Sequence, residues 1–383
     1  MTVLAAMTAG PAPAQPSDDS GARLTAGSSH TCMLARDGKA LCWGSGAHGQ
    51  LGNGGTSNRA RPAAVDAPAG VTFSSLTAGD GHTCGLAGGV TAYCWGRGDM
   101  GQLGDGGSAD RVRPVAVDAP AGLTFRQLTA GDDHTCGLAG EGRAYCWGRG
   151  DYGRLGNSGV AGQSRPVVVD APAGVTFSRL AAGGDHTCGL TGDGRAYCWG
   201  RGDHGRLGIN NSVVYRWSPV AVDAPAGVTF SELAAGGGHT CGQGNDTVTY
   251  CWGEGESGAL GDGGAANRLR PTAVGAPDGV TFTELAAGGD HTCALGDDTK
   301  AYCWGAGSSG ALGDGGSVNR SRPVAVDAPA GVTFTRLAAG GDYTCGLAGD
   351  TKGYCWGSGS GGLLGNSAVA NQSRPVAVAA PAG

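Results

Sequence analysis

One pair of cysteines, ten residues apart, returns seven times along this chain and accounts for all 14 of its cysteines. Successive pairs are 52 or 53 residues apart. The pairs are Cys32 and Cys42, Cys84 and Cys94, Cys136 and Cys146, Cys188 and Cys198, Cys241 and Cys251, Cys293 and Cys303, and Cys345 and Cys355. A strict period of this length indicates a repeat architecture instead of several unrelated domains.

Each copy contains four short runs of strand-forming residues between turns. In the fourth copy these runs are residues 175–182, 186–190, 195–199 and 218–222. Glycine supplies 78 of the 383 residues, as many tight turns would require. Four strands per copy and terminal copies that look like the rest favour a closed ring over a solenoid. We therefore predict an all-β, seven-bladed β-propeller with four-stranded antiparallel blades, spanning residues 21–383 with about 52 residues per repeat.

The repeat resembles that of the regulator of chromosome condensation family. The segment AAGGDHTCGLTGDGRAYCWGRGDHGRLG carries the resemblance, and its pattern of His-Thr, Tyr-Cys-Trp-Gly and Leu-Gly recurs along residues 20–383. The resemblance implies a seven-bladed propeller. It implies little about function, because propellers of this family serve unrelated roles.

The two ends of the chain depart from the repeat. The Val-Thr-Phe segment that opens the other six copies, with Leu in place of Val in the third, has no counterpart before Leu24. The ring is therefore expected to close either by mixing strands from both ends or by using residues 2–6 to fill the gap. Residues 1–20 form an Ala/Pro-rich segment that we interpret as export-related or as a flexible extension.

The two cysteines of each copy are expected to face each other across a hairpin. Cys188 and Cys198 are symmetric about a Gly-Asp-Gly loop, so their Cα atoms should lie about 4.5–5.5 Å apart, which a disulfide accepts. The alternatives are buried free thiols in a cytosolic protein and a metal site that adds His186. Zinc usually takes a fourth ligand, and the seventh copy has Tyr343 at the histidine position. We therefore predict one disulfide in every blade and no metal site.

The tryptophan after each second cysteine points away from the sulfur atoms and is expected to fill the space between blades. These residues are Trp43, Trp95, Trp147, Trp199, Trp252, Trp304 and Trp356. A light-sensing relative in the family places tryptophans beside an Arg-His-Thr triplet. In this chain Ser, Gly or Asp precedes each His-Thr, so photoreception is not predicted.

An Asp-His pair recurs just before the hairpin of several copies. The examples are Asp133-His134, Asp185-His186 and Asp290-His291, with Asp342-Tyr343 in the seventh copy. We expect them to form a ring near one mouth of the central channel, where Asp or His caps backbone N–H groups. The repeated LGDGG and LGNSG segments are interpreted as turns instead of calcium sites. No acid, base or nucleophile breaks the repeat, so we predict no catalytic residues and no cofactor.

Departures from the repeat mark the candidate binding residues. Copies two to four carry Arg-Gly-Asp after Trp-Gly, whereas the corresponding sector of copies five to seven is interpreted as nearly neutral. Arg-Gly-Asp is also a cell-adhesion tripeptide, which is common by chance in Gly-rich loops. The fourth copy has one extra residue in its loop, residues 209–220, and that loop contains the only tryptophan outside the repeat pattern. The partner-binding candidates are Tyr215, Arg216, Trp217, Arg97, Arg149, Tyr152, Arg201 and His204. Packing of Trp217 against a neighbouring blade is an equal alternative.

Charge and hydropathy exclude some classes of function. The net charge of −6 and the absence of Lys and Arg from residues 1–20 argue against nucleic acid as a partner. There is also no apolar run of about 18 residues that would form a membrane-spanning helix.

We predict a non-catalytic secreted or cell-surface propeller that binds a protein, a glycan or a second copy of itself. The resemblance leaves two alternatives. One is an intracellular regulator of a small GTPase, of the guanine-nucleotide exchange type. The other is a secreted enzyme inhibitor that would use the aromatic loop residues Tyr152, Tyr215, Trp217 and Tyr343.

Overall fold

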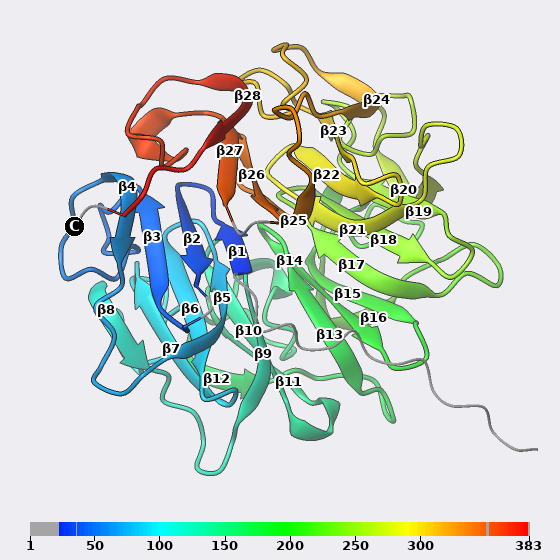
Figure 1. Ribbon diagram of the computed structural model, residues 1–383. Coiled ribbons are helices and arrows are strands. Elements are labelled where there is room, and N and C mark those ends of the chain that lie inside the picture. Colours follow the sequence, from blue (N-terminus) through cyan, green and yellow to red (C-terminus); the bar gives the residue numbers. More distant parts are fainter. Residues whose placement is uncertain (1–22, 36, 350–351, 382–383) are drawn as a thin grey trace, which may run out of the picture.

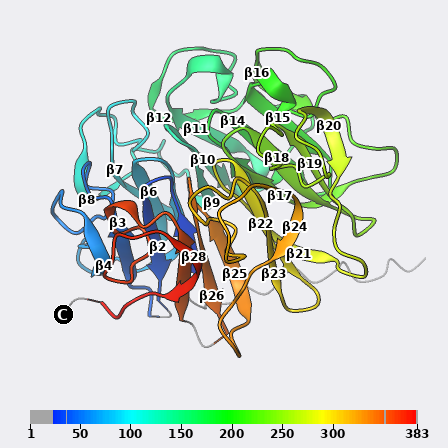
Figure 2. The same cartoon turned by 90° about the horizontal axis from the view of Figure 1, so that it is seen from above.

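The computed structural model describes residues 23–35, 37–349 and 352–381, and within them it contains seven four-stranded antiparallel sheets. The sheets surround a common axis, and the blue first blade lies next to the red last blade (Figures 1 and 2). The predicted seven-bladed propeller is therefore confirmed. The segment of residues 1–20 lies outside the described residues.

Every blade uses four consecutive strands, and the first strand is the innermost. The first strands are β1 (Arg23–Ala26), β5 (Phe73–Ala78), β9 (Phe125–Ala130), β13 (Phe177–Ala182), β17 (Phe230–Ala235), β21 (Phe282–Ala287) and β25 (Phe334–Ala339). The second strands are β2 (His30–Leu34), β6 (His82–Ala87), β10 (His134–Ala139), β14 (His186–Thr191), β18 (His239–Gly244), β22 (His291–Gly296) and β26 (Tyr343–Ala348).

The third and fourth strands complete each blade toward its outer edge. The third strands are β3 (Ala40–Gly44), β7 (Thr91–Gly96), β11 (Ala144–Gly148), β15 (Ala196–Arg201), β19 (Thr249–Gly253), β23 (Ala301–Gly305) and β27 (Gly353–Gly357). The fourth strands are β4 (Arg59–Ala64), β8 (Arg111–Ala116), β12 (Gln163–Val168), β16 (Tyr215–Ala221), β20 (Arg268–Ala273), β24 (Arg320–Ala325) and β28 (Gln372–Ala377). Short 3-10 turns are η1 (Gly140–Gly142), η2 (Asp151–Gly153), η3 (Asp203–Gly205) and η4 (Ser360–Gly362).

Strand β16 begins three residues earlier than the sequence predicted. Its first residue, Tyr215, pairs with Arg201, and Arg216 pairs with Gly200. The extra loop residue of the fourth copy therefore lengthens an outer strand and places the start of that strand next to β15.

The cysteine pair of every blade forms a disulfide between its second and third strands, as predicted. Cys188 lies directly opposite Cys198, and the paired Cα atoms are 4.1 Å apart, slightly closer than expected. All these cysteines are fully buried. Because each sulfur is bonded to another sulfur, the alternative of a metal site built from His186 and two thiolates is wrong.

The core of the protein lies between the blades. Trp95 of blade 2 packs in one cluster with the disulfide of Cys32 and Cys42 in blade 1 and with Phe73. Its indole N–H donates a hydrogen bond to the carbonyl oxygen of Gln50 in blade 1, at 2.9 Å. All seven repeated tryptophans are fully buried, which confirms their predicted place between blades.

A second contact between blades uses the histidine at the start of the second strand. The Nε2 atom of His82 lies 2.8 Å from the hydroxyl of Thr135 in the next blade, and that hydroxyl donates to the carbonyl oxygen of Gln102 at 2.9 Å. Since the single hydroxyl proton is already committed, Nε2 of His82 must be the donor. Six buried histidines repeat this arrangement: His30, His82, His134, His186, His239 and His291. The histidines are therefore not exposed at the channel mouth, contrary to the expected Asp-His ring.

The ring closes where blade 7 meets blade 1, and there Tyr343 replaces the histidine. Its hydroxyl donates to the carbonyl oxygen of His30 at 2.6 Å and accepts from the hydroxyl of Thr31 at 2.9 Å. Trp43 donates its indole N–H to the carbonyl oxygen of Leu363 at 2.9 Å. Since all seven sheets consist of consecutive strands, the predicted alternative of mixed strands is wrong for the described residues. The alternative that used residues 2–6 lies outside them.

Removal of the Tyr343 hydroxyl should destabilise the closed ring. The variant Tyr343→Phe leaves a buried carbonyl and a buried hydroxyl without this partner, so we expect a loss of about 1–3 kcal/mol in the free energy of unfolding. Denaturant unfolding measures this loss in the free energy of unfolding. The matched control is Tyr197→Phe, because the Tyr197 hydroxyl makes no hydrogen bond within the described residues and its loss should cost under about 0.5 kcal/mol. Equal effects of the two variants would contradict a special role for Tyr343.

Acid should also destabilise the fold, because six histidines are buried in the neutral form. Burial lowers the pKa of His30 and His291 to about 4 and of His82 and His239 to about 3. The pKa values of His134 and His186 are lowered as well. Between pH 6.5 and about 4 the unfolded chain binds more protons, so stability falls with falling pH, by on the order of 1 kcal/mol per pH unit for each histidine.

Buried carboxyl groups act in the opposite direction. Burial raises the pKa of Asp132 to about 6 and of Glu232 to about 7, and the stability that they contribute is lost as pH rises through this range. Because the histidines outnumber them, we expect the melting temperature to fall from pH 7 to pH 5, as calorimetry would measure. His134→Gln should reduce this pH dependence, whereas His48→Gln, at an exposed histidine, should not. A melting temperature that is constant or rises toward pH 5 would disprove the expectation.

Candidate functional site

The predicted partner-binding residues all lie on one face of the ring. Because neighbouring strands run in opposite directions, the first–second and third–fourth connections of each blade emerge on the same side. We call this side the loop face; in blade 3 it consists of residues 131–133 and 149–162. The eight candidates come from third–fourth connections or from the adjoining strand ends of blades 2, 3 and 4.

The centre of the loop face is a narrow channel mouth. The Ala-Gly ends of the seven innermost strands, with Ser28 and Asp132, line a cavity of about 110 Å³. Glycine is required here: a Cβ on Gly131 would lie 2.3 Å from the carbonyl oxygen of Gly183 and 2.3 Å from the ring of His134. The cavity is smaller than the roughly 300–1,000 Å³ of most small-molecule sites.

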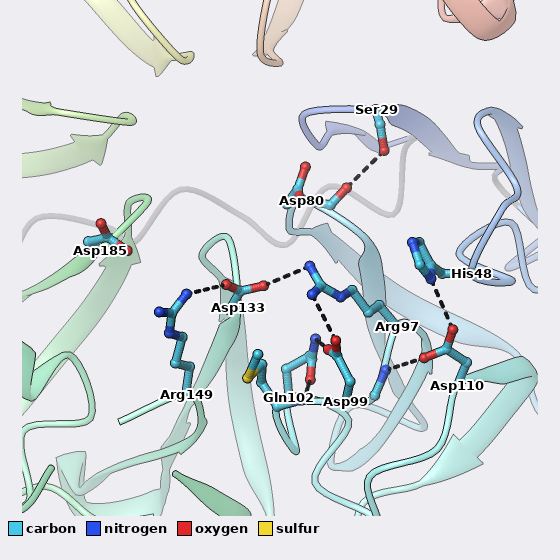
Figure 3. Close-up of polar contacts among 12 residues, drawn as sticks. Ser29, His48, Asp80, Arg97, Asp99, Gln102, Asp110, Asp133, Arg149 and Asp185 are labelled. Atoms are coloured by element: carbon cyan, nitrogen blue, oxygen red, sulfur yellow. Dashed lines mark hydrogen bonds and ion pairs between the residues drawn. The ribbon is translucent and has the colours of Figure 1, made fainter. Parts of the chain in front are cut away.

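Two aspartates at the channel mouth, Asp133 and Asp185, each bridge two arginines. Figure 3 shows the bridge made by Asp133. Asp133 lies 3.4 Å from Nη1 of Arg97 in blade 2 and 3.3 Å from Nη1 of Arg149 in blade 3. In blade 4, Asp185 pairs with Arg201 at 3.2 Å and with the fully buried Arg154 of blade 3 at 2.7 Å. These pairs connect the loops of three neighbouring blades, so the loops are held as one unit.

The Arg-Gly-Asp tripeptides are closed by internal ion pairs. Arg97 pairs with Asp99 at 2.8 Å, as Figure 3 shows, and Arg149 pairs with Asp151 at 2.7 Å. In the third tripeptide, Arg201 pairs in the same way with Asp203. The charged groups therefore face each other within each tripeptide, which does not favour recognition as an extended adhesion loop.

Tyr152 contacts two arginines where blades 3 and 4 meet. The guanidinium carbons of Arg154 and Arg201 lie 5.6 Å and 5.4 Å from the centre of its ring, within the range of cation–π contacts. Its φ angle of 61° is unusual for a residue with a side chain. His204 adopts the same conformation one blade later and lies 3.5 Å from Glu254. Tyr152 remains 37% exposed, so part of a fixed aromatic ring faces solvent.

The extra loop of blade 4 joins this aromatic group. The rings of Tyr215 and Trp217 are 4.4 Å apart, and Trp217 packs against Gly153, the neighbour of Tyr152. A Cβ on Gly153 would lie 2.9 Å from the Trp217 ring. Trp217 is half-buried, whereas Tyr215 is 41% exposed. The packing interpretation therefore holds for Trp217, and Tyr215 is free to contact a partner.

The structure thus unites four of the eight candidates in one patch. We call this patch the blade 3–4 junction and define it by Tyr152, Arg201, Val214, Tyr215 and Trp217. The remaining candidates surround it: Arg97 and Arg149 lie in the network at the channel mouth, and His204 contacts blade 5. Arg216 is half-buried and makes no ion pair within the described part of the chain.

The opposite sector of the loop face is acidic, contrary to the neutral sector predicted from the sequence. Glu254, Glu256, Asp290 and Asp342 lie there. Burial raises the pKa of Asp290, and the three neighbouring carboxylates raise it further. The segment WGEGE of the fifth copy was the signal for this charge, because Glu254 stands where blades 2 to 4 have an arginine.

Tyr343 was proposed as an exposed aromatic residue, and this prediction is wrong because the ring closure buries it completely. The LGDGG segments form turns as predicted: Asp105 accepts a hydrogen bond from the backbone N–H of Gly107 and pairs with Arg111 at 2.7 Å. No cluster of three His, Cys, Asp or Glu side chains placed to hold a metal ion occurs among residues 23–35, 37–349 and 352–381. In the same residues no helix has the length and apolar character needed to span a membrane.

Comparison with known proteins agrees with this architecture. Residues 113–382 match the RCC1-like domain, and residues 37–86 and 22–50 match the regulator of chromosome condensation (RCC1) repeat. The ultraviolet-B receptor UVR8 of Arabidopsis thaliana is 31% identical over 353 residues, which cover 92% of this chain and 80% of that protein.

Solved structures share the fold. Yeast RCC1 (Prp20), crystallised with Kap60, has a TM-score of 0.80 at 22% identity, covering 99% of this chain and 91% of that chain. The ectodomain of the receptor kinase CR4 from Physcomitrella patens has a TM-score of 0.56 at 27% identity, covering 88% of this chain and 73% of that chain. The chain therefore belongs to the family of β-propellers built from regulator of chromosome condensation (RCC1) repeats.

Proposed function

We propose that this protein is a non-catalytic binding or scaffold module that works outside the reducing cytosol, as a secreted or cell-surface propeller. The observation that carries the proposal is the set of seven disulfides, one buried in the centre of every blade. Disulfides persist in oxidising compartments and are rare in the cytosol. The similarity to the CR4 ectodomain supports the same location.

The blade 3–4 junction is the surface that we assign to a protein partner. Exposed Tyr152 and Tyr215 and half-buried Trp217 are residue types that dominate interface hot spots. Tyr152 already contacts two arginines, which restricts its side chain, so less side-chain entropy would be lost when a partner covers it. The small volume of the channel mouth also favours a macromolecular partner over a small substrate.

The UV-B response of the Arabidopsis relative is not part of the proposal. All seven repeated tryptophans are buried between blades, and Trp217 is the one tryptophan outside that pattern. Inhibition of a secreted enzyme is a second candidate function, because it would use the same exposed rings of Tyr152 and Tyr215. Regulation of a small GTPase inside the cell is less favoured, since seven disulfides would have to persist against cytosolic reductants.

The oxidation state of the protein in its own cells tests the location. We expect no alkylation of the intact chain under denaturing conditions without reductant, and alkylation of all 14 cysteines after reduction. Intact-mass spectrometry distinguishes the two states. A chain isolated with free thiols in its unreduced form would contradict the proposed compartment.

Site-specific photo-crosslinking tests the proposed surface. In one variant a photoreactive residue replaces Tyr215 at the junction, and in a second variant it replaces Arg195 in the hairpin turn on the opposite face. Each variant is displayed on the surface of the cells that produce the protein. We expect a protein adduct from position 215 and none from position 195, because the junction is the surface that we assign to the partner. Mass spectrometry identifies the adduct, and an adduct with a second copy of the chain would indicate self-association. Adducts of equal yield at both positions, or none at position 215, would remove the junction from the proposal.

A further inference from the structure

The outermost strands carry a repeated set of ion pairs. In blade 2, Arg111 pairs with Asp105 of its own blade at 2.7 Å, and Arg113 pairs with Asp66 of the preceding blade at 2.5 Å. The first kind of pair recurs as Arg268–Asp262 and Arg320–Asp314, and the second as Arg165–Asp118, Arg270–Asp223 and Arg374–Asp327. In these pairs a guanidinium group faces a carboxylate supplied by the protein.

Blade 1 keeps both arginines and has lost both carboxylates. Arg59 occupies the position of Arg111, but Asn53 replaces the aspartate of its own blade. Arg61 occupies the position of Arg113, but Ala379 stands where the preceding blade should supply an aspartate. Arg61 instead donates to the hydroxyl of Ser367 in blade 7 at 2.6 Å. Arg59 has no ion-pair partner among the described residues.

The rest of the chain shows that this combination is unusual. In blades 3 and 7 the aspartate is also replaced by asparagine, and there the arginine is replaced as well: Asn157 accompanies Gln163, and Asn366 accompanies Gln372. Blade 6 leaves Arg322 opposite Gly275, but its companion Arg320 is still paired. Blade 4 keeps Arg216 although Ile209 replaces its aspartate, but Ser218 replaces the companion arginine. Within the described part of the chain, β4 is therefore the outer strand that presents two arginines without a carboxylate for either.

The two arginines line one cavity. Together with Asn58, Ser367 and three alanines of β4, Arg59 and Arg61 border an open cavity of about 490 Å³. It lies at the contact of blade 1 and blade 7, which Figures 1 and 2 show side by side. The volume falls within the range typical of ligand sites, roughly 300–1,000 Å³. Both guanidinium groups are exposed, so a ligand can reach them from solvent.

We propose that this cavity binds a ligand that carries two carboxylate groups. The planar fork of a guanidinium matches a carboxylate, and the equivalent arginines of other blades each hold one. The ligand would therefore replace the two carboxylates that blade 1 lacks. An acidic peptide segment and a uronate-containing sugar share this chemistry. The proposal does not depend on the blade 3–4 junction, because no residue of that patch borders the cavity.

Side-chain NMR of the full-length protein tests the proposal with defined probes. An acetylated tetra-aspartate peptide represents the peptide source, and trigalacturonate represents the sugar source. We expect at least one of them to shift the Arg59 and Arg61 Nε–H signals saturably. The double variant Arg59→Gln/Arg61→Gln should weaken the binding of that probe at least about tenfold, as expected for lost charge-assisted hydrogen bonds. The matched variant Arg111→Gln/Arg113→Gln should change it less than about twofold.

A second variant fills the site without removing the arginines. In Asn53→Asp/Ala379→Asp the protein itself supplies both carboxylates, as blades 1 and 2 already do for Arg111 and Arg113. The probe should therefore bind about tenfold more weakly to this variant. The melting temperature of the variant should not fall. No saturable shift with either probe would overturn the proposal, as would binding of inorganic phosphate alone. Equal losses in the Arg59/Arg61 and Arg111/Arg113 variants would also overturn it.

Discussion

The contact between neighbouring blades is the interaction on which the rest of this structure depends. No β-ladder connects one sheet to the next among the described residues. Side-chain contacts therefore hold the ring together, with isolated backbone hydrogen bonds between loops and outer strands, such as the one from the N–H of Ser367 to the carbonyl oxygen of Ala60 at 2.8 Å. Each tryptophan packs on the disulfide of the preceding blade, as Trp95 does on Cys32 and Cys42, and each histidine donates to a threonine hydroxyl of the next blade. The disulfide thus has two roles: it links two strands of its own blade and forms the surface on which the next blade packs. A loop face built on such a ring is rigid before any partner arrives.

The contacts that recur in every blade form the ring, and the residues that depart from the repeat give individual sectors their own chemistry. At the closure, Tyr343 replaces a histidine and reaches Thr31 and the backbone of His30. At the blade 3–4 junction, an extra residue brings Tyr215 and Trp217 beside Tyr152. On β4, the loss of two carboxylates leaves Arg59 and Arg61 beside a cavity. The first and third of these breaks lie at the contact of blades 7 and 1, and the second lies at the contact of blades 3 and 4.

The sequence predicted the structural features that follow from the repeat length and from strand pairing within one blade. The spacing of Cys188 and Cys198 determines a hairpin pair, and alternation along that strand directs Trp199 away from the sulfur, toward the neighbouring blade. It did not predict which polar groups meet across two blades, because a single repeat does not reveal how two sheets are placed against each other. His134 was therefore expected at the channel mouth instead of beside Thr187, and Tyr343 was expected in solvent. The pairing of Arg97 with both Asp99 and Asp133 depends on the same placement between blades.

Native-state hydrogen exchange of the backbone amides in the second strands tests this account most directly. If side-chain packing closes the ring as firmly between blades 7 and 1 as elsewhere, the amides of β2 and β26 should exchange as slowly as those of β10 and β14, through global unfolding alone. All seven blades would then report one common free energy of opening. Amides of β2 and β26 that exchange much faster than those of β10 and β14 would show that the ring opens at this contact, and would contradict the account.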